Sequence, residues 1–131
     1  MEIKRKEFAF KGKSLEDLKK LSTREFASYV KSRERRTLLR QFQEIEQFIE
    51  RAKKKIAKNK PVKTHLRNII VVPELVGIKV QVYNGKKYIP FEITEDMLGH
   101  RFGEFAPTRE RVKHSSAGVG ATKGSKFKSK K

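Results

Sequence analysis

The sequence contains no cysteine. It can therefore form neither a disulfide framework nor a thiol-based site, which is typical of an intracellular protein. No apolar run approaches the ~20 residues that a membrane-spanning helix needs. The basic N-terminal stretch also lacks the apolar segment of a secretory signal. These absences predict an intracellular protein that does not contact membranes.

Acidic residues are also scarce, because 15 Asp and Glu stand against 33 Lys and Arg in 131 residues, a net charge of +18. The excess is uneven. Residues 1–60 carry 19 basic and 9 acidic side chains (net +10), residues 74–98 carry 3 and 4 (net −1), and residues 107–131 carry 8 and 1 (net +7). A nearly neutral centre between two basic ends predicts that a polyanion contacts the ends.

No arrangement of residues points to catalysis, a metal or a cofactor. The histidines His65, His100 and His114 lack the paired spacing of a metal site. The segment GVGATKGS at 118–125 has its Lys and Gly in the wrong order for a phosphate loop. No carboxylate pair lies in an apolar setting. We therefore expect a non-enzymatic nucleic-acid binder. A chromatin-like DNA-binding protein and an RNA-processing enzyme are the rival hypotheses.

Two alternating apolar runs flank Asn84-Gly85, which is the strongest short signal for a β-hairpin. We predict antiparallel strands within 78–93, joined by a two-residue loop. Apolar residues then lie opposite one another on one face. The predicted pairs are Tyr83–Lys86, Val80–Ile89 and Ile78–Phe91. Residues 68–72, which are apolar on both faces, are predicted to form the third strand; the strand order stays open.

Helical signals dominate the first half of the chain. Ser14 and Ser22 are expected to start two short helices, the second with the S-x-x-E capping box. Residues 32–59 form a long helical pattern, which should stop before Pro61. Its predicted apolar stripe is Leu38, Phe42, Ile45, Ile49, Ala52 and Ile56. A short helix is expected from Thr94 to Gly99, with Phe102 and Phe105 anchoring the loop that follows.

Within the long helix, Arg33, Arg35 and Arg36 surround the single acid Glu34. Because guanidinium groups match the geometry of phosphates, this cluster favours RNA contact. From Val112 onward, Gly, Ser and Lys offer almost nothing to bury. Ordering such a tail costs ~1–2 kcal/mol per residue in backbone entropy, so we expect it to be disordered when free.

The predicted fold class is α+β: a small three-stranded sheet with an Asn-Gly hairpin, covered by N-terminal helices, with a disordered basic C-terminal tail. We divide the single domain into a helical N-terminal region (1–60), a sheet-containing rRNA-binding core (61–111) and a basic flexible tail (112–131).

Several motifs resemble the small-subunit ribosomal protein S-nineteen family: KTHLRN (63–68), VPE (72–74), VG (76–77), VYNGK (82–86), MLGH (97–100) and GEFAPTR (103–109). The tail motifs VKH (112–114) and GVGAT (118–122), together with SRERR (32–36), resemble the archaeal and eukaryotic branch. The run APTR at 106–109 resembles the bacterial sequences of the family more closely than the eukaryotic ones, which favours an archaeal source. The resemblance covers essentially the whole chain.

This resemblance implies a structural protein that binds rRNA of the 3′ major (head) domain in the cytoplasmic ribosome. It also implies a neighbouring head protein of the S-thirteen family and a tail that reaches toward the decoding region and A-site tRNA. Carried onto this sequence, the implied rRNA contacts are Lys63, His65, Arg67, Asn68, Asn84, Gly85, Lys86, His100, Arg101, Gly103, Thr108, Arg109, Arg111, Lys113 and His114. For Glu104 two roles stay open, RNA-facing or accepting donors within its own loop.

Overall fold

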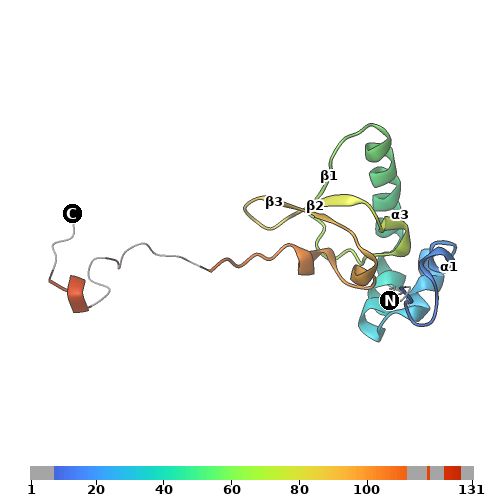
Figure 1. The fold of residues 1–131 in the computed structure, drawn as a ribbon, viewed down its shortest axis with the longest axis horizontal. Helices are drawn as coiled ribbons and strands as arrows, with labels where there is room; N and C mark the ends of the chain where they lie inside the picture. The colour runs from blue at the N-terminus through green and yellow to red at the C-terminus, as the bar shows by residue number, and fades with distance from the viewer. Residues whose placement is uncertain (1–7, 112–117, 119–122, 128–131) are drawn as a thin grey trace, which may run out of the picture.

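Helix α3 (Ser32–Ala57) stands beside a three-stranded sheet, and the short N-terminal helices lie next to its first half (Figure 1). The computed structural model describes residues 8–111, 118 and 123–127. The sheet has the order β1-β2-β3, with β1 parallel and β3 antiparallel to β2. Its strands are β1 (Val62–Thr64), β2 (Lys79–Tyr83) and β3 (Tyr88–Glu92). The α+β class is therefore confirmed.

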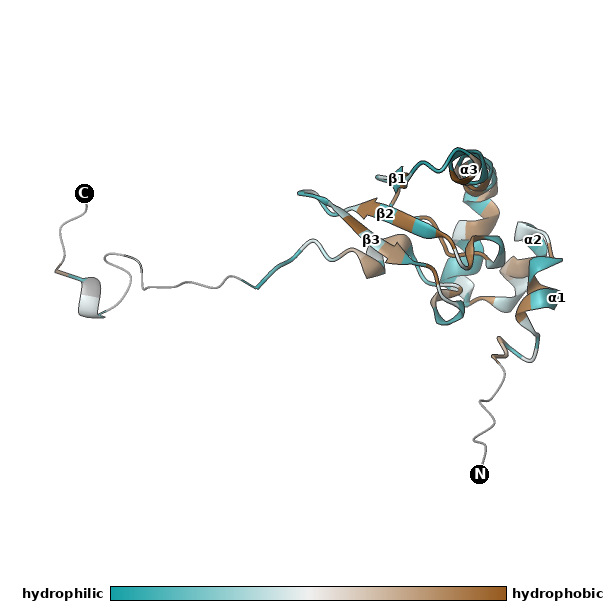
Figure 2. Cartoon of the chain, turned by 45° about the horizontal axis from the view of Figure 1, so that its top comes forward, coloured by the Kyte–Doolittle hydropathy of each residue, from teal (hydrophilic) through white to brown (hydrophobic). Residues whose placement is uncertain are grey.

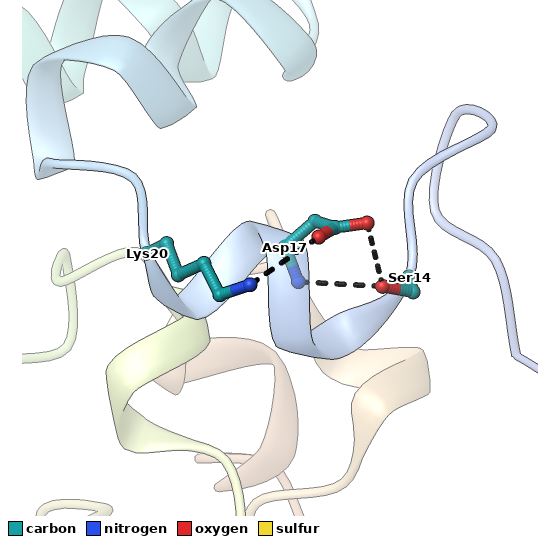
Figure 3. A network of polar contacts seen from close by, with 3 residues as sticks. All are labelled: Ser14, Asp17 and Lys20. Carbon is teal, nitrogen blue, oxygen red and sulfur yellow. Dashed lines mark hydrogen bonds and ion pairs between the residues drawn. The ribbon is translucent and has the colours of Figure 1, made fainter.

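The two short helices begin where their capping residues predict. In α1 (Leu15–Lys19), the Ser14 hydroxyl accepts a hydrogen bond from the Asp17 N–H at 3.3 Å and donates to the Asp17 carboxylate at 2.8 Å. Lys20 adds an ion pair with Asp17 at 3.8 Å (Figure 3). In α2 (Thr23–Phe26), Ser22 and Glu25 form the complete capping box. Each cap satisfies N–H groups that have no partner inside the helix.

Helix α3 buries one stripe of its surface, as its periodicity predicts. Three differences from the predicted stripe are visible: Ile56 is 43% exposed, Phe42 is only half-buried, and Phe48 joins the buried set. The helix contains a kink at Gln41 (φ −111°, ψ 19°), which the pattern does not reveal. It ends at Ala57, and Asn59 then adopts a positive φ of 52°. The buried residues are Leu38, Ile45, Phe48, Ile49 and Ala52.

Strands β2 and β3 are antiparallel neighbours, but the predicted register is wrong by two residues. Tyr83 pairs with Tyr88 rather than with Lys86, so the loop holds the four residues 84–87. The Asn84 side chain explains the longer loop, because its Oδ1 accepts the N–H groups of Lys86 (3.0 Å) and Lys87 (2.8 Å). The shift by an even number keeps each side chain on its predicted face. The other observed pairs are Val82–Ile89, Gln81–Pro90, Val80–Phe91 and Lys79–Glu92.

The predicted third strand at 68–72 is also wrong. The third strand is β1, and 68–72 is instead a buried segment that pairs with the loop after β3. The N–H of Val71 donates to His100 O at 2.8 Å, and the N–H of Phe102 donates to Ile69 O at 3.0 Å. Residues 69–72 are at most 1% exposed, so the expected burial is confirmed. A segment covered on both faces lies inside the core, whereas a sheet with one solvent face needs alternation such as Val62-Lys63-Thr64.

The loop after β3 is held by short 3₁₀ turns. The helix expected from Thr94 is a single turn, η3 (Glu95–Met97), and the Thr94 side chain makes no capping bond. In η4 (Phe102–Phe105), Phe102 is fully buried and its ring meets those of Phe48 (5.5 Å) and Phe91 (6.2 Å), which confirms the predicted anchor. The remaining turns are η1 (Ala27–Tyr29), η2 (Pro73–Leu75) and η5 (Lys123–Ser125).

One hydrophobic core joins α1, α2, α3, the sheet and the loop after β3. Figure 2 shows hydrophobic residues on β2 and β3, and hydrophilic residues at the tip between these strands. None of the described helices is long and apolar enough to cross a bilayer.

The Arg67 guanidinium connects three segments through backbone carbonyls. It donates to Tyr83 O at 2.8 Å, to Gly103 O at 3.0 Å and to Ala106 O at 2.6 Å. The backbones of Arg67 and Gly103 also meet directly, because the Gly103 N–H donates to Arg67 O at 2.9 Å. A Cβ at position 103 would lie 3.2 Å from that oxygen, which explains the glycine. The side chain thus links the segment after β1, the end of β2 and the loop after β3.

We predict that Arg67→Met lowers the free energy of unfolding by roughly 2–4 kcal/mol, because three half-buried carbonyls lose a charged donor. Chemical denaturation measures the change. The matched control is Arg51→Met, because Arg51 is exposed on α3 and bonds only to Gln47 O one turn away. The control should change stability by less than about 0.5 kcal/mol. Equal effects for the two variants would contradict the linking role.

The capping box predicts a pH dependence of stability. Hydrogen bonds from the backbone N–H and then the side chain of Ser22 lower the pKa of Glu25. A lowered folded pKa means that the carboxylate stabilises the protein above its unfolded pKa, and that this contribution is lost as pH falls through the folded pKa. Glu25→Gln should therefore reduce stability near neutral pH, with the difference vanishing in strong acid. Denaturation curves across pH check this, with Glu16→Gln as control. A difference independent of pH would refute it.

Candidate nucleic-acid interface

The solvent face of the sheet carries three rings that contact one another. Strand alternation buries Val80 and Val82, so Tyr83 lies on the opposite face, where it meets Tyr88 across the hairpin at 5.1 Å between ring centres. His65, just after β1, lies 4.7 Å from the Tyr83 ring and 5.4 Å from the Tyr88 ring. We call His65, Tyr83 and Tyr88 the aromatic patch. His65 is exposed and both tyrosines are half-exposed.

A cation accompanies the patch. The Lys63 Nζ lies 5.3 Å from the centre of the Tyr88 ring. Exposed rings beside a cation suit single-stranded nucleic acid, because bases stack on the rings while the cation neutralises phosphate. Sequence reasoning found Lys63 and His65 but missed both tyrosines. The signal was available: aromatic residues stand at outward-facing positions on both sides of the Asn84 loop.

The tip between β2 and β3 is shaped by Asn84 and presents Lys86. Besides accepting two loop N–H groups, Asn84 donates from Nδ2 to Pro107 O at 3.4 Å. Gly85 has a φ of 97°, which other residues rarely adopt, and both Gly85 and Lys86 are exposed. The sequence-predicted residues of the tip therefore divide into one that holds the loop and two that face solvent.

Three further sequence-predicted residues have partners inside the protein. Arg67 and Gly103 form the link described above. The Asn68 Nδ2 donates to Gln41 Oε1 at 3.1 Å, at the kink of α3. These residues position the surfaces around them.

Within the loop residues 100–104, the Glu104 carboxylate contacts both His100 and Arg101. His100 Nδ1 and Glu104 Oε2 lie 2.8 Å apart, and Glu104 Oε1 accepts the Arg101 N–H at 3.3 Å. Of the two roles left open for Glu104, the structure has the one in which it accepts donors within its own loop. Arg101 contacts α3, because its Nη2 donates to Thr37 Oγ1 at 3.0 Å.

The Arg101 side chain completes a basic crevice against α3. Its lining from the helix consists of Arg33, Arg36, Thr37, Arg40 and Gln41, and its volume is about 230 Å³. We call Arg33, Arg36, Arg40 and Arg101 with these two polar residues the arginine crevice. Among the described residues that line it, none is acidic.

Arg35 does not line this crevice, so the predicted group of Arg33, Arg35 and Arg36 is divided between the crevice and a contact with η1. Arg35 Nε donates to Ala27 O at 3.0 Å and its Nη2 to Ser28 O at 2.9 Å. On a helix, Arg35 lies on a different side from positions 33, 36 and 40. Its guanidinium fastens α3 to η1. Arg40, which the sequence analysis did not include in the site, lines the crevice together with Arg33 and Arg36.

After Ala106 the chain leaves the body of the protein as an exposed segment (Figure 1). Thr108, Arg109 and Arg111 lie on it and are exposed. Lys113, His114 and most of the predicted tail lie outside the described residues.

Comparisons with known proteins agree with the resemblance in the motifs. The model of the family described as Ribosomal protein S19 matches residues 30–114, a stretch that contains α3, the sheet and both surfaces described above. Small ribosomal subunit protein uS19 of Methanococcoides burtonii is 44% identical over 126 residues, which cover 92% of this chain and 87% of the relative. Its counterpart in Thermoplasma acidophilum, with the same name, is 49% identical over 123 residues, which cover 93% and 80%. The chain therefore belongs to the ribosomal protein S19 family, in its archaeal type.

Proposed function

We propose that this protein is a structural, non-enzymatic constituent of the small ribosomal subunit in the cytoplasm. It binds rRNA of the 3′ major domain and stabilises the head of the subunit. Two relatives named small ribosomal subunit proteins support the assignment to the ribosome. The net charge of +18 supports binding to a polyanion.

The observation that carries the proposal is the aromatic patch with Lys63 at its side. A surface that binds only duplex backbone needs cations but no exposed rings. Exposed rings add a second kind of contact, because unstacked bases of folded RNA stack on them. The patch lies on the sheet face opposite the core, so base contact requires no opening of the fold.

The sequence-predicted contacts take different roles in this proposal. Direct contact with rRNA falls to side chains that face solvent or line the crevice: Lys63, His65, Gly85, Lys86, Arg33, Arg36, Arg101, His100, Thr108, Arg109 and Arg111, with Tyr83, Tyr88 and Arg40 added. Lys113 and His114 continue this series beyond the described residues. Arg35, Arg67, Asn68, Asn84 and Gly103 act by holding these surfaces in place.

The remaining proposals concern partners. Within the head we propose contact with a neighbouring protein of the S-thirteen family. We propose that the basic C-terminal tail reaches toward the decoding region and A-site tRNA. Support for the tail comes from its composition, since Gly, Ser and Lys bury little and carry positive charge.

Filter binding across salt concentrations tests the proposal. The protein should bind a transcript of the 3′ major domain of small-subunit rRNA more tightly than duplex DNA of equal length, with the preference kept at 200 mM salt. If ~8 phosphates are contacted, the affinity for the transcript should fall ~10³–10⁵-fold between 50 and 200 mM salt. Equal affinity for both would favour a general chromatin-like binder. Cleavage of the transcript that depends on His100 or Arg101 would instead indicate an RNA-processing enzyme.

A second prediction isolates base stacking from charge. Tyr88→Leu should weaken binding of the transcript roughly tenfold, because stacking on one ring contributes ~1–3 kcal/mol. Tyr88→Phe keeps the ring and should bind like the native protein. The slope of affinity against salt should be equal in all three, since no charge changes. A matched control without a charge change is Gln81→Leu, on the same sheet face but outside the patch, which should bind like the native protein. Loss of binding in Tyr88→Phe, or a changed slope in Tyr88→Leu, would contradict stacking.

A further inference from the structure

The arginine crevice is built from two parts of the chain that lie far apart in sequence. Arg33, Arg36 and Arg40 follow one another at steps of three and four residues along the first half of α3, so their side chains share one flank of the helix. Arg101 comes from the loop after β3 and closes the crevice from the other side.

Arg101 is held in a defined place at both ends. Its backbone N–H donates to Glu104 Oε1 at 3.3 Å, and its Nη2 donates to Thr37 Oγ1 at 3.0 Å. The Thr37 hydroxyl donates its own hydrogen to Arg33 O at 3.2 Å. The lone pairs of the Thr37 oxygen can therefore accept the N–H of the Arg101 guanidinium. Thr37 is therefore a positioning residue, since it orients Arg101 toward the other arginines.

The far end of the crevice is fixed as well. Gln41, at the kink of α3, accepts a hydrogen bond from Asn68 at 3.1 Å, and Asn68 precedes the buried segment 69–72. The lining residue Gln41 is thus connected through Asn68 to the buried segment 69–72.

Four guanidinium groups in about 230 Å³, with no acidic lining residue among those described, repel one another. Each offers paired N–H donors that match phosphate oxygens. One backbone phosphate carries a single negative charge, so several are needed to balance four cations. We infer that the arginine crevice binds adjacent phosphate groups of one rRNA strand, at a point where the backbone bends into it. The inference rests on the proposed function and deepens it by naming the ligand of this surface.

Two substitutions that leave the net charge unchanged test whether the contact between Thr37 and Arg101 matters for binding. Thr37→Val keeps the shape and net charge but removes the acceptor that orients Arg101, whereas Thr37→Ser keeps the hydroxyl. The assay is filter binding of the full chain to the 3′ major domain transcript. Thr37→Val should bind several-fold more weakly, because Arg101 loses the acceptor that orients it. Thr37→Ser keeps this acceptor and should bind like the native protein. If Thr37→Val binds as the native protein does, the inference is overturned.

Substitutions that remove a positive charge provide the second part of the test. Arg36→Gln should weaken binding roughly tenfold and reduce the salt slope by about 1. Lys54→Gln, an equal charge change on an exposed residue at the other end of α3, should have a smaller effect. Ethylation interference should show adjacent phosphates of one strand whose signal is lost in Arg36→Gln and Thr37→Val but retained in Lys54→Gln. Circular dichroism confirms that each variant is folded.

The outcomes separate the two proposals. If the native protein fails to prefer the transcript, the proposed function fails and the inference falls with it. If the native protein binds but Arg36→Gln matches Lys54→Gln, only the inference fails. Scattered phosphates in the interference pattern would overturn it too. So would displacement of the transcript by polyglutamate at matched charge, because the crevice would then be a site for acidic peptide.

Discussion

The interaction on which the structure most depends is the contact of one guanidinium with three backbone carbonyls. Arg67 reaches Tyr83 O, Gly103 O and Ala106 O, which belong to β2 and to the loop after β3. Arg67 itself lies in the segment after β1, a strand of only three residues, so a backbone ladder contributes little to holding this segment in place. A planar group with several donors can bind carbonyls from different directions, which a backbone ladder cannot. The link holds the end of β2, where Tyr83 lies, against the loop that follows β3.

The positive charge of the chain serves two different purposes. Arg67 and Arg35 are bound to backbone carbonyls of their own protein and hold its segments together. Arg33, Arg36 and Arg40 line an open crevice with no described acid in its lining. Since net charge is a property of the whole chain, composition alone does not separate these roles. The separation follows from which carbonyls lie within reach of each side chain.

Much of the fold could be predicted because its causes are local. The N-cap at Ser14, the capping box at Ser22 and the periodicity of α3 depend on residues within one or two turns, so each helix begins as expected. The errors concern distant partners. Segment 68–72 has the composition of a strand, yet its backbone bonds to residues 99–102. The register of the hairpin was missed because the Asn84 side chain, rather than a tight turn, closes the loop.

For the site, the sequence by itself determined which residue types are available, where charge concentrates and, through long motifs, the family. It did not determine which of these side chains lie next to one another. The aromatic patch joins His65 to tyrosines about twenty residues away, and the crevice joins Arg101 to Thr37 across 64 positions. Only the tertiary structure decided these neighbours, because packing of the core fixes how α3, the sheet and the loop meet, and sequence spacing carries no measure of that distance.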